Sequence, residues 1–325
     1  MRRTLAVLLL GACSSPAPPG PGSWQRVRPL PVERFEAPAA ALDGKLYYLG
    51  GITDNCPDGA AACTVADVDV YDPASGEWTA GPALPADSAR HHLAIAVLDG
   101  RLWVLGGFTG ILGIQQFLPV PATYVLDAGT WQRRADQPLA RGAATAQAID
   151  GRIYVAGGGT QEPDSRSELF VYDPSTDQWS ARQAMPTARE HLASCTIGGK
   201  LVAIGGWAGA DRTAVAAVES YDPAADQWRS LPALPTARGG LAATVLGGVC
   251  YVIGGEDWAL PLPGTFTANE GFDPAGGRWY AFAALPAARH GIGVAAVGPS
   301  LFVVGGGPSQ GNSYTAEVDL FTPSP

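Results

Sequence analysis

The chain has 325 residues, 46% of them hydrophobic, and a formal net charge of −9 at pH 7. Nucleic acid is therefore not expected as a partner, because a phosphate backbone requires a basic surface. Removing Arg2 and Arg3 with residues 1–12, which contain no acidic residue, takes the net charge from −9 to −11.

The N-terminus carries a targeting signal. Arg2 and Arg3 precede the apolar run Thr4–Leu10, and Leu10-Gly11-Ala12-Cys13 follows. The run is too short to span a bilayer, so it predicts a secretory signal. It resembles a bacterial lipoprotein signal, which implies that residues 1–12 are removed and that Cys13 carries the lipid. Cleavage at an ordinary small-residue site is the alternative.

Residues 13–22 are rich in proline and predict an extended, semi-rigid tether. The expected location is therefore the periplasm or the outer cell surface. The membrane would be contacted only through the lipid anchor.

Residues 23–325 read as copies of one unit. In Arg189–Trp228 the β-like runs are His191–Ile197, Lys200–Ile204, Ala217–Tyr221 and a run opening at Trp228, without helical periodicity. The Gly-Gly pair that ends the second run recurs at spacings of 56, 51, 48, 49 and 51 residues: Gly50-Gly51, Gly106-Gly107, Gly157-Gly158, Gly205-Gly206, Gly254-Gly255 and Gly305-Gly306. Four strands in a period near 50 residues predict an all-β, six-bladed β-propeller with four antiparallel strands per blade.

A second element follows each of four Gly-Gly pairs: YDPASGEW, YDPSTDQW, YDPAADQW and FDPAGGRW, with a weaker copy, VLDAGTW, ending at Trp131. This Gly-Gly, Tyr-Asp and Trp pattern resembles the kelch repeat over nearly all of the chain after residue 23. The resemblance implies a kelch-type propeller.

Ring closure is predicted from the tryptophans. Five blades carry a terminal tryptophan, whereas the sixth ends at Glu317–Phe321 without one. Trp24 lies at the other end of the chain, so we expect the N-terminal strand to be the outermost strand of the last blade. That closure hides the edges that an open ring would expose.

The cysteines fall into two groups. Cys56 and Cys63 flank a short loop, and an exported setting favours a disulfide between them, worth roughly 2.5 kcal/mol on the chain-entropy model. Cys195 and Cys250 lie inside strand-like runs and are expected to be buried thiols.

The four strands of a blade alternate in direction. The short turns between strands one and two and those between strands three and four therefore lie on the same face of the propeller. The loops after the Gly-Gly pairs lie on the opposite face, called here the second face. These loops differ in length and chemistry, so binding is expected there.

An arginine precedes the first strand of every blade: Arg34, Arg90, Arg141, Arg189, Arg238 and Arg289. Six arginines could form an anion-binding ring. The alternative is that each bonds carbonyls or an acid of its own repeat, and a residue present in all six units favours this structural role.

The two positions after each arginine break the repeat. The first row is Phe35, His91, Gly142, Glu190, Gly239 and His290, and the second is Glu36, His92, Ala143, His191, Gly240 and Gly291. All four histidines lie in these rows. His91, Glu190 and His290 belong to alternate blades, so they could bind a metal or supply acid–base chemistry to a sugar. A hydrated polar channel mouth is the alternative, and neither a metal nor another cofactor is expected.

Aromatic residues add ligand-binding candidates. Trp207 follows Gly206, and Trp258 and Phe117 lie in long loops. They could stack on sugars or anchor a partner, or they could pack over a blade end. Asp54, Asn55 and Asp58 could suggest calcium, but their spacing is not that of an EF-hand loop.

Enzymes of the kelch-like superfamily suggest one alternative. No set matches the copper site of galactose oxidase. In size the chain is similar to six-bladed bacterial N-acetylneuraminate epimerases, which implies Glu190 and Arg189 as a catalytic pair, with His91 and His290 as further candidates. The sequence therefore predicts a monomeric module that binds a protein or a glycan, with a sugar epimerase as the alternative.

Overall fold

The computed structural model describes residues 20–85, 88–110, 117–160, 164–274 and 276–324. The predicted signal, the lipid-bearing Cys13 and most of the tether lie outside these residues. Within the described part of the chain, no helix is long and apolar enough to cross a membrane.

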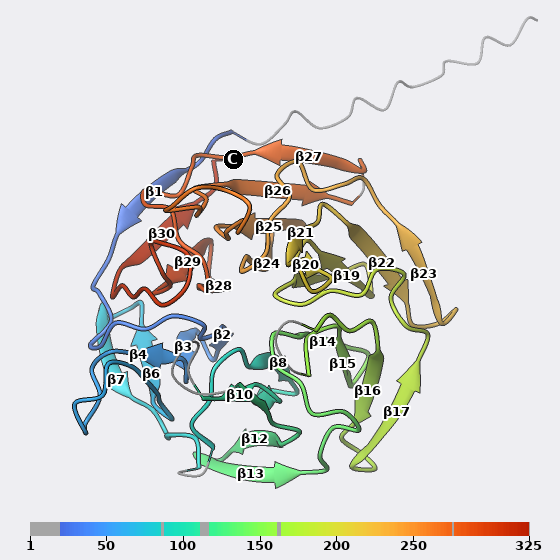
Figure 1. Ribbon diagram of the computed structural model, residues 1–325, viewed down its shortest axis with the longest axis horizontal. Coiled ribbons are helices and arrows are strands. Elements are labelled where there is room, and N and C mark those ends of the chain that lie inside the picture. The colour runs from blue at the N-terminus through green and yellow to red at the C-terminus, as the bar shows by residue number, and fades with distance from the viewer. Residues whose placement is uncertain (1–19, 86–87, 111–116, 161–163, 275, 325) are drawn as a thin grey trace, which may run out of the picture.

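Six four-stranded antiparallel sheets surround a central axis (Figure 1), which confirms the predicted six-bladed propeller. Blade one contains β2 (Ala39–Leu42), β3 (Lys45–Leu49), β6 (Val68–Asp72) and β7 (Glu77–Ala80). Blade two contains β8 (Ala94–Leu98), β9 (Arg101–Leu105), β12 (Thr123–Asp127) and β13 (Thr130–Arg134). Blade three contains β14 (Thr145–Ile149), β15 (Arg152–Ala156), β16 (Leu169–Asp173) and β17 (Gln178–Arg182). Blade four contains β18 (Ala193–Ile197), β19 (Lys200–Ile204), β22 (Val218–Asp222) and β23 (Gln227–Ser230). Blade five contains β24 (Ala242–Leu246), β25 (Val249–Ile253), β26 (Asn269–Asp273) and β27 (Arg278–Ala281). Blade six contains β28 (Gly293–Val297), β29 (Ser300–Val304), β30 (Val318–Thr322) and β1 (Ser23–Arg26).

The first strand of each blade lies nearest the axis, and the core lies between neighbouring blades. Between blades two and three, for example, Trp103 and Val125 pack against Ile153 and Tyr172. Because neighbours cover both faces of a blade, the second strands are buried along nearly their whole length, as in β9. This packing explains why they read as continuous apolar runs.

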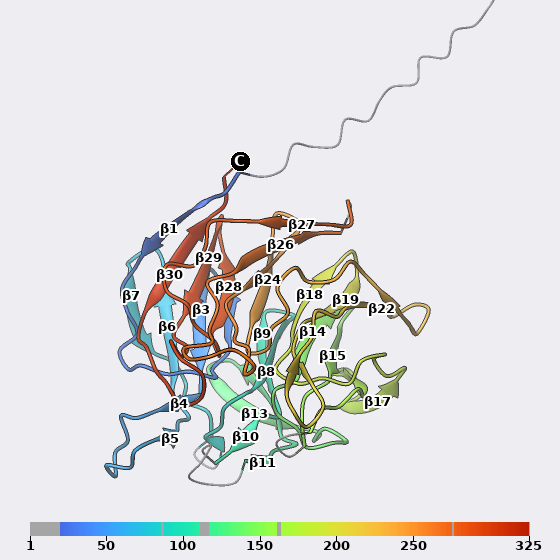
Figure 2. The same ribbon diagram turned by 45° about the horizontal axis from the view of Figure 1, so that its top comes forward.

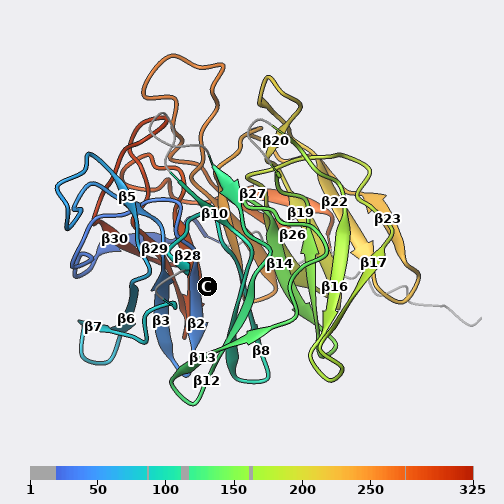
Figure 3. The same ribbon diagram turned by 60° about the horizontal axis from the view of Figure 1, so that its bottom comes forward.

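The two faces differ as expected. Asp43 and Gly44, between β2 and β3, both have positive φ, as a tight hairpin turn requires. On the second face, the loops carry three two-stranded hairpins, and Figure 3 shows the loops around β5 and β20 projecting from that side. The hairpins are β4 (Ile52–Thr53) with β5 (Cys63–Thr64), β10 (Phe108–Thr109) with β11 (Leu118–Pro119), and β20 (Trp207–Ala208) with β21 (Thr213–Ala214).

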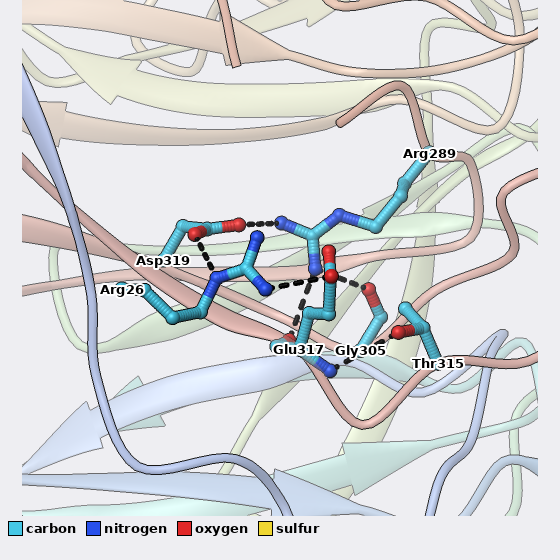
Figure 4. Close-up of polar contacts among 6 residues, drawn as sticks. All are labelled: Arg26, Arg289, Gly305, Thr315, Glu317 and Asp319. Atoms are coloured by element: carbon cyan, nitrogen blue, oxygen red, sulfur yellow. Dashed lines mark hydrogen bonds and ion pairs between the residues drawn. The ribbon is translucent and has the colours of Figure 1, made fainter. Parts of the chain in front are cut away.

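The N-terminal strand closes the ring. β1 pairs antiparallel with β30, and Trp24 lies opposite Phe321, as predicted. Figure 2 shows the blue β1 beside the red β30 at the outer edge of the last blade. Arg26 Nε donates to Asp319 Oδ1 at 2.6 Å, and Arg289 from inside the blade donates to the other oxygen of the same carboxylate (Figure 4). A buried carboxylate shared by two arginines therefore joins the first strand to the last blade.

The fourth-strand tryptophans show the same closure. Each donates its indole N–H to a backbone carbonyl of the preceding blade at 2.7–3.1 Å. The pairs are Trp24–Ala283, Trp78–Arg28, Trp131–Pro82, Trp179–Ala135, Trp228–Gln183 and Trp279–Pro232. Trp24 thus makes the contact that every other blade obtains from its own repeat.

Two disulfides are present among the described residues. Cys56–Cys63 closes the loop between β4 and β5, as predicted. Cys195 and Cys250 also form a disulfide, so the expectation that they are separate buried thiols is wrong. The reason is geometric, because β18 and β25 belong to adjacent blades and face each other across the core between them. The second disulfide therefore links blades four and five covalently.

Candidate functional site

Six residues form a ring of backbone hydrogen bonds around the axis. They are the second-row residues Glu36, His92, Ala143, His191, Gly240 and Gly291. Each N–H donates to the carbonyl of the ring residue in the preceding blade at 2.8–3.0 Å, with Glu36 donating to Gly291. Each has φ between 50° and 60°, which costs a residue with a side chain of order 1–3 kcal/mol. The closed ring offsets this cost and fixes where each side chain leaves the backbone.

The first-row residues stand beside this ring. Each forms a backbone bridge with the residue that follows its Gly-Gly pair: Phe35–Ile52, His91–Phe108, Gly142–Gly159, Glu190–Trp207, Gly239–Glu256 and His290–Gly307. The residue after each Gly-Gly pair is thereby held at the channel mouth. Glu256 was not among the candidates from the sequence. It occupies the same repeat position as Trp207, directly after a Gly-Gly pair, and that shared position could have identified it as a residue of the mouth.

Three ring residues bring their donor atoms together. One ligand atom from each of Glu36, His92 and His191 lies within 4.8 Å of the other two. His92 Nε2 is 3.1 Å from Glu36 Oε2, and both histidines are more than nine-tenths buried. Gly291 makes room for this carboxylate, because a Cβ at that position would lie 2.7 Å from Glu36 Oε1. Within the described residues, the convergent group comes from the second row.

The three residues that the sequence singled out, His91, Glu190 and His290, have other partners. His91 Nε2 lies 2.9 Å from the Gly110 carbonyl, and its Nδ1 contacts His92 Nδ1. His290 Nδ1 lies 3.1 Å from the Gly307 carbonyl. These two histidines therefore support the ring from its edge.

All four histidines are neutral at pH 7. Burial lowers the pKa of His91 to about 3 and that of His290 to about 4. Burial, and next the repulsion that a protonated His191 would exert, holds the pKa of His92 well below its ordinary value. Burial, and next the charge of Arg212, does the same to the pKa of His191. Neutral imidazoles can accept protons or bind metal ions.

Glu190 pairs with a different arginine from the one expected. Its carboxylate lies 4.0 Å from Arg212 Nε and 3.8 Å from His191 Nδ1. Arg189 points away from the mouth and bonds Glu219 at 3.0 Å within its own blade. The structure therefore places Arg189 with Glu219 and away from Glu190, and Arg212, from the turn between β20 and β21, supplies the positive charge beside Glu190. A single arginine in a variable loop gave no signal in the sequence.

The six repeated arginines are buried inside the blades and do not line the mouth cavity. Arg141 donates to the carbonyls of Gly157, Glu168 and Val155 at 2.8–2.9 Å. Arg34, Arg238 and Arg289 each bond an acid on the third strand of their own blade. Arg90 donates to the carbonyls of Gly106 and Ala122. These contacts connect the strands of each blade and form no anion-binding ring.

The aromatic candidates divide by depth. Trp207 is 2% exposed and packs on His191 with ring centroids 4.4 Å apart, and Phe117 is buried against His91. Trp258 is 38% exposed, and Arg212 lies over its ring at 5.2 Å. Trp207 and Phe117 therefore form the wall of the mouth, and Trp258 forms its rim.

Two cavities meet at the ring, and Glu36, His92 and His191 line both. The cavity at the mouth has a volume of about 30 Å³ and is also lined by Glu256 and Trp258. The channel cavity, bounded by the first strands, has about 170 Å³. The enclosed part of the mouth thus has room for an ion or one or two water molecules.

Comparisons with known proteins agree with this geometry. A model of the KLHDC2/KLHL20/DRC7 Kelch-repeats domain matches residues 122–306, and a Kelch motif model matches residues 33–85. A solved structure, "Structure of YjhT", superposes with a TM-score of 0.74 over 91% of this chain and 97% of that one, at 18% sequence identity.

Similar proteins come from diverse organisms. Kelch-like protein terF of Aspergillus terreus is 31% identical over 57% of this chain and 41% of its own length. Kelch repeat and BTB domain-containing protein 12 of Homo sapiens is 28% identical over 49% of this chain and 27% of its own length. Beta-scruin of Limulus polyphemus is 28% identical over 55% of this chain and 20% of its own length. The match thus spans less than half of each of these relatives.

Proposed function

Because this chain belongs to the kelch-repeat β-propeller family, we propose that it is an exported, lipid-anchored interaction module whose second face binds a protein or carbohydrate. The acidic net charge of −9 is consistent with a partner other than nucleic acid.

One observation carries the choice of face. The large hydrophobic side chains that are exposed in the described structure are Leu118, Trp258, Leu260 and Leu262, with exposures of 54%, 38%, 43% and 73%. All four lie in loops that follow Gly-Gly pairs, which places them on the second face. Exposed apolar groups gathered on one face are typical of a binding surface, and tryptophan is enriched at the energetic centres of interfaces.

Site-specific crosslinking in intact cells tests this surface. A photoreactive amino acid at Leu262 is expected to capture a partner, while the same group at Ser75, in a first-face turn, is expected to capture none. Capture from Leu262 should disappear when Trp258→Ala is added. Equal capture from both positions, or none from Leu262, would contradict the proposed face.

A sugar epimerase is the alternative, and one observation favours it. Glu190 is fully buried beside His191 and Arg212, where a proton-transfer group would lie. Anomer exchange of a panel of free sugars, including sialic acid, is followed by proton NMR. Catalysis that falls in Glu190→Gln with little loss of affinity would support the enzyme. Exchange at the buffer rate for every sugar would exclude it for that panel.

The anchor is tested separately. Cys13→Ala is expected to move the protein from the membrane fraction to the soluble fraction of the cell. Unchanged partitioning would rule out a lipid anchor at Cys13 without affecting the proposed binding face.

A further inference from the structure

We propose that Glu36, His92 and His191 bind a divalent transition-metal ion, such as Zn²⁺, on the propeller axis. The proposal concerns the ring at the channel mouth, so it stands whether or not the exposed loops bind a partner.

The hydrogen bonds of His91 fix the tautomer of His92. His91 Nε2 lies 2.9 Å from the Gly110 carbonyl, and a carbonyl can only accept, so Nε2 carries the proton. In a neutral ring the other nitrogen, Nδ1, is then an acceptor. Since His91 Nδ1 contacts His92 Nδ1, the proton between them belongs to His92. The Nε2 atom of a neutral His92 is left with its lone pair.

That lone pair faces a carboxylate. His92 Nε2 lies 3.1 Å from Glu36 Oε2, yet it makes no hydrogen bond among the described residues. Two electron-rich atoms at this distance in a buried site repel each other unless a cation lies between them. His191 Nδ1 is also buried without a hydrogen bond in the described structure. The ring thus brings together nitrogen and oxygen atoms whose lone pairs would be stabilised by a bound cation.

The donor set selects the class of ion. Two imidazoles and a carboxylate suit Zn²⁺ and neighbouring first-row ions, whereas Ca²⁺ and Mg²⁺ prefer oxygen ligands alone. Ligands of a tetrahedral Zn²⁺ stand about 3.4 Å apart, so donors within 4.8 Å need to close by little more than an ångström. The mouth cavity of about 30 Å³ leaves room for the ion and a water molecule in the open fourth position.

The surroundings have the features of a supporting shell. The hydrogen bond that His92 Nδ1 donates to His91 Nδ1 orients His92, as outer-shell partners do at metal sites. The ring centroids of Trp207 and His191 are 4.4 Å apart, and those of Phe117 and His92 are 5.8 Å apart. The backbone ring fixes all three ligand-bearing residues, so the site is largely formed before an ion binds.

Metal titration of the full-length protein, freed of tags and treated with chelator, tests the proposal. Zn²⁺ is titrated by calorimetry, and Co²⁺ by its visible spectrum, which reports nitrogen and oxygen coordination directly. One equivalent of each ion is expected to bind, with Zn²⁺ at micromolar affinity or tighter. Glu36→Gln is expected to weaken binding at least 10-fold, and Glu33→Gln, the same change three residues away, is the matched control and should leave the affinity unchanged.

His191→Asn provides a second variant, because asparagine tolerates the positive φ of this position. Its thermal melt establishes that it folds, and its Co²⁺ spectrum should be lost. Absence of one-equivalent binding to the wild-type protein would overturn the proposal. So would an affinity that Glu36→Gln leaves unchanged, since the ion would then lie elsewhere. A histidine ¹⁵N spectrum showing doubly protonated His92 at pH 7 would also overturn it, because a proton would then occupy the place assigned to the metal.

Discussion

Replacing Trp24 with alanine tests whether the N-terminal strand closes the ring. Trp24 is half-buried, packs against Phe321 with the ring centroids 4.9 Å apart and the ring planes tilted, and donates its indole N–H to the Ala283 carbonyl at 2.8 Å. Truncating a fully buried tryptophan costs about 3–5 kcal/mol, so half burial corresponds to about 2 kcal/mol. The hydrogen bond adds about 1 kcal/mol, which gives a total loss of about 3 kcal/mol.

Two variants separate these contributions. Trp24→Phe keeps the ring contact but loses the hydrogen bond, so it should cost about 1 kcal/mol. For a chain of this size, 1 kcal/mol corresponds to about 2 °C in melting temperature. Differential scanning fluorimetry should therefore show a decrease of about 6 °C for Trp24→Ala and about 2 °C for Trp24→Phe.

Trp131→Ala is the matched control. Trp131 is also half-buried and donates to the Pro82 carbonyl at 2.8 Å, but it lies inside an uninterrupted blade. Its melting temperature should fall by a similar amount. Limited trypsin digestion distinguishes the two variants. The Arg26 and Arg28 side chains are already exposed, but Arg26 is paired with Asp319 in the sheet, so only Trp24→Ala is expected to loosen β1 and let trypsin cleave there.

Either of two results would contradict closure of the ring by β1. One is a Trp24→Ala protein that melts within 1 °C of the wild type. The other is a Trp24→Ala protein in which Arg26 stays as resistant to trypsin as it is in Trp131→Ala. In both cases the contact between β1 and β30 would contribute nothing to stability.

Three other predictions concern stability. Asp177 accepts hydrogen bonds from the backbone N–H of Ala135 in the preceding blade and from Tyr172, and these hold its pKa below the usual 3.8. Its contribution to stability should be present above about pH 3.8 and lost as the pH falls through the lowered pKa. The difference in urea midpoint between wild type and Asp177→Asn should therefore shrink on acidification, and a widening difference would contradict this. Cys195 and Cys250 are 55 residues apart, so replacing both with alanine should cost about 4 kcal/mol in urea unfolding under oxidising conditions, and equal stability would contradict a structural role. Arg141→Met should cost about 3 kcal/mol because it leaves buried carbonyls without donors, and an unchanged urea midpoint would refute that role.

The architecture was predictable because its signals repeat. The Gly-Gly pairs recur because another part of the backbone lies too close for a side chain. A Cβ on Gly50, for example, would lie 2.5 Å from the Arg90 carbonyl oxygen. The missing tryptophan of the last blade identified β1 as its outer strand, since each blade needs that contact with its neighbour. Repetition converts a weak local signal into a strong one.

The site was less predictable because it depends on residues that break the repeat. Glu36 stood in the correct row but was not singled out, since its role arises only where Gly291 leaves space beside it. Arg212 reaches the mouth from a loop whose path the sequence does not specify, whereas Glu256 follows a Gly-Gly pair at the repeat position of Trp207 and could have been identified there. The Cys195–Cys250 disulfide depends on the relative register of two blades, which periodicity alone does not give.

The pairing of β1 with β30 has a consequence for the order of folding. Arg26 and Asp319 are 293 residues apart, so the first strand of the propeller to be synthesised waits for almost the last. At 5–20 residues per second this interval is roughly 15 to 60 s. Blades one to five can pair their own strands while they emerge, whereas β1 has no partner until β30 appears. The last blade is therefore assembled from the earliest and the latest segments of the chain, and a chain that stops before β30 leaves β1 without its partner strand.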